Sequence, residues 1–197
     1  SVLGTVFGID SPVTVIQMLW VNIIMDTLGS LAFAGEPALA DYMNEKPTKK
    51  SESILTSSMV RRVALTGLFA LAVSMLFLLS PGMRCLFGGG GICHLTGFFA
   101  LFVFMGIGIA FCTRTERLNI LHGALKNKAF ILIMPAVAVI QLLIVYFGGE
   151  VFRCTPLDPH QLAVCAIMAF SVVPADTVRK AVLRIIGQRE RGTQHGR

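Results

Sequence analysis

Asn22 and Asp26 are the two residues whose types and spacing point most directly to a binding site. They lie four residues apart in the apolar stretch MLWVNIIMDTLGSLAF, so on a helix they share one face, one turn apart. An acid in a membrane helix costs about 2.5–3.5 kcal/mol on insertion scales and usually faces a bundle interior or an ion pathway. Because hard cations prefer oxygen ligands, we interpret the pair as cation ligands. A hydrogen bond to a neighbouring helix is the alternative interpretation.

The composition indicates that these residues lie in a membrane. Charged residues make up 14% of the 197-residue chain and apolar residues 54%, whereas soluble domains carry about 25% charged residues. A helix that crosses a bilayer needs about 20 mostly apolar residues. We therefore expect an all-α integral membrane protein, a helical bundle with five full transmembrane helices plus the end of a preceding helix in residues 1–9. The predicted spans are residues 13–34, 63–79, 95–112, 129–147 and 162–178.

The positive charges predict the orientation of these helices. Cytoplasmic loops of membrane proteins carry the excess of Lys and Arg. Of the 17 Lys and Arg residues, only Arg84 and Arg153 fall in the loops after the second and fourth spans. We therefore expect the basic tail, residues 179–197, and the loop that begins at Gly35 to be cytoplasmic. The net charge of +6 is then a topology signal, and no nucleic-acid partner is expected.

Three longer segments carry a family pattern. They are SPVTVIQMLWVNIIMDTLGSLAFAGEPA, EKPTKKSESILTSSMVRRV and NKAFILIMPAVAVIQLLIVYFGGEVFRCTPLDPHQLAVC. In this order they resemble the sixth membrane helix, the following cytoplasmic loop, and the ninth helix to the start of the tenth in P-type calcium-transporting ATPases of the plasma-membrane, calmodulin-regulated kind. The resemblance implies that residues 1–178 form the C-terminal cation-transporting transmembrane domain of such a pump, and that residues 179–197 form its basic cytoplasmic tail.

The resemblance also implies a role for Asn22 and Asp26. In these pumps the matching Asn and Asp of helix six bind the transported Ca²⁺, together with a Glu and backbone carbonyls of helix four. The expected function is therefore export of Ca²⁺ from the cytosol. Met25 precedes Asp26, as in the one-ion kind, and the helix-eight segment FFALFVFMGIGIAFCTR contains no acid or amide, so a single calcium site is expected. A P-type pump for another cation and a truncated, non-transporting membrane protein are the alternatives.

Energy coupling is expected to come from other parts of the pump. The Asp-Lys-Thr-Gly phosphorylation motif and the Thr-Gly-Glu loop do not occur in the sequence, and the chain opens in an apolar run without Met. We therefore expect a fragment that does not hydrolyse ATP alone, so that ATP and Mg²⁺ act only through the missing catalytic domains. The expected partners are the N-terminal and catalytic parts of the same pump. The plasma membrane is the expected location, with the vacuolar and endoplasmic-reticulum membranes as alternatives.

Two polar residues within the other spans have structural interpretations. Gln141 lies inside the span 129–147 and is expected to hydrogen-bond a neighbouring helix. Asp176 is followed by Arg179 and Lys180 within about one turn, which predicts an interfacial ion pair rather than a transport ligand.

The cysteines and the tail suggest two further features. Cys85 and Cys93 flank the glycine run 88–91 in a loop predicted to be exoplasmic, where disulfides persist, so they are candidates for a disulfide with Cys154 as the competing partner. The tail segment VRKAVLRIIGQRERG has apolar residues at helical spacing with basic residues between them. Such a helix lies on anionic lipid or binds calmodulin. Because Trp and Phe anchors are missing, contact with membrane lipids is favoured over calmodulin.

Overall fold

The described part of the chain is entirely helical in its regular structure. A computed structural model describes residues 13–34, 57–113 and 127–182, and within these ranges every regular element is a helix, which confirms the all-α class. The helix end expected in residues 1–9 lies outside the described residues. Five helices are long and apolar enough to cross a membrane, as predicted: Val15–Ala32, Met59–Leu79, Ile92–Thr113, Lys128–Phe147 and Pro159–Val182.

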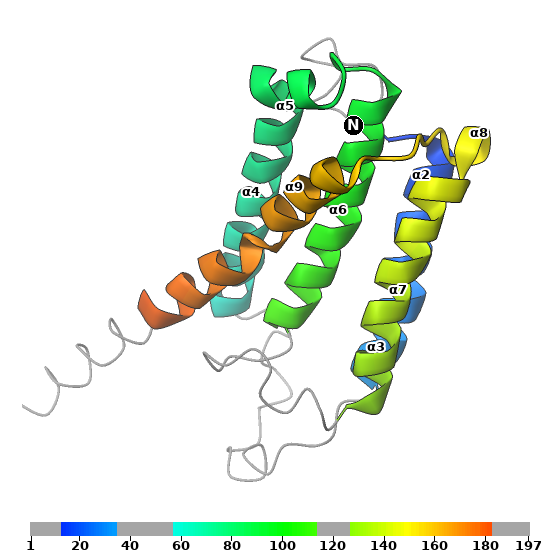
Figure 1. The fold of residues 1–197 in the computed structure, drawn as a ribbon. Coiled ribbons are helices and arrows are strands. Elements are labelled where there is room, and N and C mark those ends of the chain that lie inside the picture. Colours follow the sequence, from blue (N-terminus) through cyan, green and yellow to red (C-terminus); the bar gives the residue numbers. More distant parts are fainter. Residues whose placement is uncertain (1–12, 35–56, 114–126, 183–197) are drawn as a thin grey trace, which may run out of the picture.

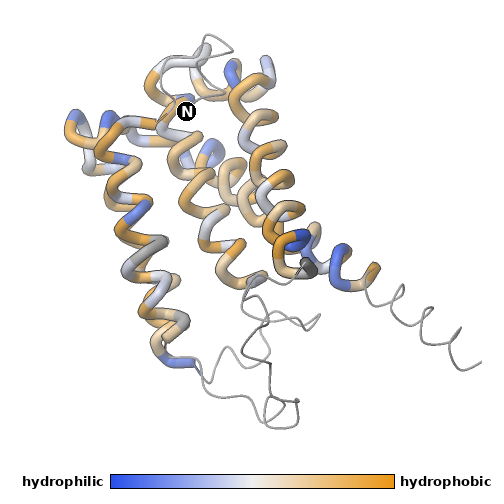
Figure 2. The backbone as a smooth tube through the Cα atoms, turned by 180° about the vertical axis from the view of Figure 1, so that it is seen from behind, coloured by the Kyte–Doolittle hydropathy of each residue, from blue (hydrophilic) through white to orange (hydrophobic). Residues whose placement is uncertain are grey.

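The outer surface of the bundle is apolar. Figure 2 shows hydrophobic residues along most of each helix, with hydrophilic residues gathered toward the helix ends. Large apolar side chains point away from the interior, among them Val15, Leu132 and Phe147, which is 82% exposed. An outward-facing apolar surface is unfavourable in water but suits hydrocarbon, where helices satisfy their own backbone hydrogen bonds. The surface therefore agrees with a membrane location.

Helix α6 (Ile92–Thr113) runs through the centre of the bundle (Figure 1). Helix α4 (Ser57–Leu79) packs along one side of it, and α9 (Pro159–Phe170) crosses it and continues as a helical stretch over residues 172–182. This last stretch passes four residues beyond the predicted end of the fifth span at Val178. The remainder of the predicted tail, residues 183–197, lies outside the described residues.

The other side of the bundle is a helical rod paired with α7 (Lys128–Phe147). The rod, called helix six below, consists of α2 (Val15–Asn22), η1 (Ile23–Gly29) and α3 (Ser30–Ala34). Two short helices, α5 (Pro81–Leu86) and α8 (Gly149–Phe152), lie at the same end of the molecule, which we call the α5–α8 end (Figure 1).

Close approach between elements depends on two glycines of α6. A Cβ atom on Gly97 would lie 2.5 Å from Cε1 of Phe87, whose ring belongs to a buried aromatic group. In that group the His94 ring stacks on Phe77 at a centroid distance of 5.1 Å. A Cβ atom on Gly108 would lie 2.9 Å from a methyl group of Val172. Because packed interiors leave no room for even one extra carbon, these positions fix how near α5 and the last helix come to α6.

A buried ionic cluster fixes the last helix at the end opposite α5 and α8. Asp176 Oδ1 accepts from Nε of Arg179 at 2.8 Å, and its Oδ2 forms an ion pair with Nζ of Lys180 at 2.6 Å. This confirms the predicted ion pair. Lys180 Nζ and Arg62 Nη2 also donate to the Cys112 carbonyl, at 2.9 and 3.0 Å. The cluster therefore joins the last helix to α4 and to the C-terminal turn of α6, where cations are favoured by the helix dipole.

Substitution of Gly97 by Ala should destabilise the bundle. The new methyl group must displace the fully buried Phe87 ring, so we expect a loss of about 1–3 kcal/mol, read as a lower unfolding midpoint in detergent. Gly67→Ala is the matched control, because a Cβ atom there meets nothing within 4 Å and Ala is a better helix former. Equal losses in the two variants would contradict the packing role of Gly97.

Asp176→Asn should be more damaging than an ordinary surface change. The substitution leaves the cations of Arg179 and Lys180 without their counter-charge, and Lys180 is only 3% exposed. Removal of one member of a buried ion pair costs about 3–5 kcal/mol. Asp158→Asn, at the N-cap of α9, makes the same chemical change at a position where Asn caps as well as Asp. An unfolding midpoint that is the same in both variants would exclude the structural role of the cluster.

Candidate metal centre

Helix six changes its geometry at the two predicted ligands. The α-helical stretch α2 ends at Asn22, residues Ile23–Gly29 form a π-helix, and α-helix resumes at Ser30. Asp26 therefore lies in the middle of the π-helical segment, and Asn22 lies at its start. Insertions of this kind are rare and occur frequently at functional sites. The structure thus has an irregular backbone at the point where the sequence predicts cation ligands.

The local chemistry gives a reason for the irregular turn. The hydroxyl of Thr27 donates to the carbonyl of Ile23, four residues earlier. A side chain that bonds back to such a carbonyl competes with the backbone N–H and tends to bend a helix. Gly29 closes the segment, and a Cβ atom there would be 3.5 Å from the Ile24 carbonyl, an ordinary contact. The hydroxyl of Thr27 is therefore the clearer local cause.

The structure describes the side chain of Asn22 but only the backbone of Asp26. The side chain of Asn22 is exposed and makes no capping hydrogen bond. For Asp26 the structure describes the backbone, and the side chain lies outside the described part. Among the described residues, no group of three or more His, Cys, Asp or Glu side chains gathers where a metal ion would bind. In that part of the chain, other helices therefore bring no cluster of acids to helix six.

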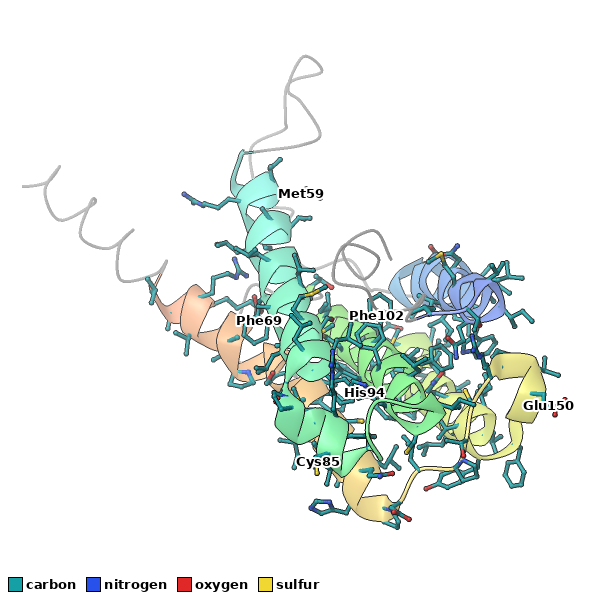
Figure 3. The ribbon with its side chains drawn as sticks, turned by 90° about the horizontal axis from the view of Figure 1, so that it is seen from above. Met59, Phe69, Cys85, His94, Phe102 and Glu150 are labelled. Carbon is teal, nitrogen blue, oxygen red and sulfur yellow. The ribbon has the colours of Figure 1, made fainter. Side chains whose placement is uncertain are left out.

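A cavity of about 440 Å³ lies beside the π-helical segment. Its walls come from helix six, α4, α6 and α7, and Figure 3 shows the labelled Phe102 on α6 toward the side of helix six. Among the described residues of the wall, Thr113 is the one with a polar side chain. The wall residues are Val21, Ile24, Gly29, Ala70, Phe102, Val103, Met105, Gly106, Ile107, Ile109, Ala110, Thr113, Met134 and Val137.

The cavity determines what α6 can offer to an ion on helix six. Along this wall α6 presents glycine and apolar side chains, with the Thr113 hydroxyl as its single side-chain oxygen, which is too few for a second hard-cation site. The wall beside helix six is therefore almost entirely apolar and forms surroundings of low dielectric constant.

The first half of helix six is attached to the α7–α8 region by side chains. Gln17, which is 2% exposed, donates from Nε2 to the carbonyl of Phe152 at 2.7 Å. Trp20 donates from Nε1 to Oε1 of Gln141 at 3.2 Å, which confirms the expected bond between Gln141 and a neighbouring helix. The rings of Trp20 and Phe152 also meet edge to face at 6.5 Å. Helix α2 is therefore held by two amides and an aromatic contact.

The other half of helix six is attached at the first residue before α7. Asn127, which is 1% exposed, donates from Nδ2 to the carbonyl of Ala32 in α3 at 2.9 Å. Its Oδ1 accepts from the N–H of Phe130 at 3.0 Å and so caps α7. Sequence reasoning did not single out Asn127 or give Gln17 a partner. An Asn directly before an apolar run is a helix-start signal, but the sequence does not contain the distant Ala32 contact.

The predicted disulfide is not formed in the structure. Cys85 is an exposed free thiol, and the Cys93 thiol lies 3.5 Å from Oε1 of Gln161 as a donor. The alternative partner, Cys154, is buried and accepts from Gln17 Nε2 at 3.8 Å. Burial raises the pKa of the Cys154 thiol, although the Gln17 bond acts in the opposite direction. Each of these thiols therefore has separate surroundings rather than a sulfur partner.

Comparisons with known proteins place these helices in a family. Residues 10–182 match the family described as cation transporting ATPase, C-terminus. The chain is 31% identical over 182 residues to plasma membrane calcium-transporting ATPase mca-1 of Caenorhabditis elegans, covering 87% of this chain and 14% of the relative. It is 32% identical over 176 residues to calcium-transporting ATPase 10, plasma membrane-type, of Oryza sativa subsp. japonica, covering 87% and 17%.

A human relative shows similar identity and coverage. Plasma membrane calcium-transporting ATPase 3 of Homo sapiens is 32% identical over 167 residues, which cover 79% of this chain and 14% of the relative. The matched part of the chain thus spans 14–17% of the length of these relatives. Because the family match extends from before α2 to the end of the described helices, the chain belongs to the cation-transporting ATPases and corresponds to their C-terminal membrane region.

Proposed function

We propose that this chain is the C-terminal membrane portion of an ATP-driven pump that exports Ca²⁺ from the cytosol, and that Asn22 and Asp26 bind the transported ion. The observation that carries the proposal is the π-helical segment Ile23–Gly29, which interrupts a membrane helix at these two residues. The relatives named above are calcium-transporting ATPases, which supports Ca²⁺ as the ion.

The proposed chemistry follows from the coordination that a calcium ion requires once it has lost its water ligands. Ca²⁺ takes about 6–8 oxygen ligands, of which Asp26 and Asn22 supply a carboxylate and an amide carbonyl. In transporters, interrupted helices near the bilayer midplane use freed backbone carbonyls as additional ligands. One carboxylate does not balance the charge of a divalent ion, so further acidic and carbonyl ligands come from the parts of the pump outside this chain. ATP and Mg²⁺ likewise act through those parts. The N-terminal and catalytic parts of the pump are thus the proposed partners of this chain.

The apolar wall of α6 supports one ion per cycle. The cavity beside helix six is lined on the α6 side by glycine and apolar side chains, with Thr113 as the polar exception. A second ion on that side would lose its hydration shell without gaining oxygen ligands, which is strongly unfavourable. We therefore infer a single calcium site centred on helix six.

The proposed orientation puts the α5–α8 end outside the cytosol. The loops after the first and third spans and the C-terminal tail carry nearly all of the Lys and Arg residues, so these regions are assigned to the cytosol. The names of the relatives favour the plasma membrane. For the tail, whose residues 183–197 lie outside the described part, lipid contact is proposed in preference to calmodulin binding because apolar aromatic anchors are missing.

Asp26→Asn in the full-length pump should abolish Ca²⁺-dependent formation of the phosphoenzyme, because it removes the one negative ligand on helix six. Asn22→Ala should decrease the apparent Ca²⁺ affinity about tenfold through loss of one oxygen ligand. Both are measured by titrating Ca²⁺ against incorporation of phosphate from labelled ATP. Asp158→Asn is the matched control and should leave the titration unchanged. Normal Ca²⁺-activated phosphorylation of Asp26→Asn would exclude the site assignment.

Thiol labelling should test the orientation. In sealed right-side-out vesicles, a membrane-impermeant maleimide should label Cys85, which is exposed at the α5–α8 end, and Cys85→Ser should remove that label. Cys154 should react slowly because it is buried and its raised pKa lowers the thiolate fraction. If Cys85 pairs with Cys93 in cells, labelling appears only after reduction. Labelling of Cys85 confined to inside-out vesicles would reverse the orientation.

A further inference from the structure

Helix six is attached to the rest of the bundle on both sides of its π-helical segment. Before the segment, Trp20 Nε1 donates to Gln141 Oε1 at 3.2 Å. After it, Asn127 Nδ2 donates to the Ala32 carbonyl at 2.9 Å. Both partners, Gln141 and Asn127, come from the α7 side, and both are buried. Helix α7 therefore carries one polar contact to each half of helix six.

The described side chains of the segment between these attachments make no comparable polar contact. Its described side chains form no hydrogen bond to another helix, since the hydroxyl of Thr27 is used within the segment itself. On one side Ile24 and Gly29 border the apolar cavity. An irregular backbone that is bonded at its ends and bordered by a cavity in its middle is free to change shape there while its flanks stay in register.

Gln141 has a feature that fold stability does not explain. The residue is 0% exposed, and in the described part of the chain its Nε2 has no hydrogen-bond partner. A buried donor without an acceptor costs free energy, so an apolar side chain of similar size at this position would serve packing at least as well. The Oε1 atom, by contrast, is bonded to Trp20, two residues before Asn22. The benefit of the amide therefore lies in fixing Trp20.

We propose that Gln141 is a positioning residue for cation binding: through Trp20 it fixes the end of α2, and with Asn127 on the far side it keeps Asn22 and Asp26 in the register that binds the ion. This inference rests on the proposed function. Loss of the Trp20 bond lets the end of α2 rotate or shift, so a smaller fraction of the molecules is competent to bind. The apparent affinity falls in proportion to that fraction, whereas the chemistry after binding is unaffected.

The test uses Ca²⁺ titration of phosphoenzyme formation in the full-length pump. Gln141→Leu should raise the half-saturating Ca²⁺ concentration about fivefold, the effect of one hydrogen bond, while the level at saturating Ca²⁺ stays normal. Trp20→Phe, which keeps an aromatic ring but removes the N–H donor, should give the same shift. The double variant should shift no further than either single variant, because all three lack the same bond.

Gln161→Leu is the matched control for loss of a buried amide. Gln161 donates to the carbonyl of Leu86 at 2.9 Å and so joins α9 to α5, and its described hydrogen bonds go to Leu86, Asp158 and Cys93. Its half-saturating Ca²⁺ concentration should stay normal even if the protein becomes less stable. An unchanged value in Gln141→Leu or Trp20→Phe would overturn the inference, as would fully additive shifts in the double variant. Failure of the calcium assignment itself is recognised separately, by normal Ca²⁺ activation of Asp26→Asn.

Discussion

The lack of water in the bilayer core is the constraint on which the rest of this structure depends. Backbone N–H and C=O groups there must be satisfied by protein, so an irregular segment is stable only where protein surrounds it or a cavity borders it. The π-helical residues Ile23–Gly29 meet this condition because Ile24 and Gly29 border the cavity between helix six and its neighbours. The segment also places an acid, Asp26, where ionisation without a cation is expensive.

The frame around helix six is built from close packing rather than from many polar bonds. Gly97 and Gly108 let α6 approach the Phe87 ring and Val172, so α6 holds α5 and the last helix on one side of the bundle. At the opposite end, the Asp176 and Lys180 pair ties the last helix to the carbonyl of Cys112. These contacts make α6 a rigid wall. The apolar cavity lies between helix six and that wall. On the α6 side of the cavity, Thr113 is the one polar side chain that could bind an ion.

Composition and spacing were sufficient to predict the helices, because the cost of a charge in hydrocarbon leaves long uncharged runs. They also predicted the Asp176 pair, whose partners are within one turn. The contacts that hold helix six could not be predicted in this way. Asn127 and Ala32 are 95 residues apart, and Gln17 and Phe152 are 135 apart, so each bond depends on how whole helices pack. The contact of the Cys93 thiol with Gln161 of another helix could not be predicted for the same reason.

The attachments of helix six leave one segment available for the proposed binding and release of the ion. If hydrogen bonds to neighbouring helices ran along Ile23–Gly29 itself, each change in ligand geometry would break several of them in low dielectric, where they are strongest. Among the described side chains, the bonds instead lie at Trp20 and Ala32, outside the segment, and the Thr27 hydroxyl bonds within it. Motion of the proposed ligands is thereby separated from the contacts that keep the helix in place. An apolar neighbour such as α6 favours this arrangement, because it offers the moving residues no alternative hydrogen-bond partner.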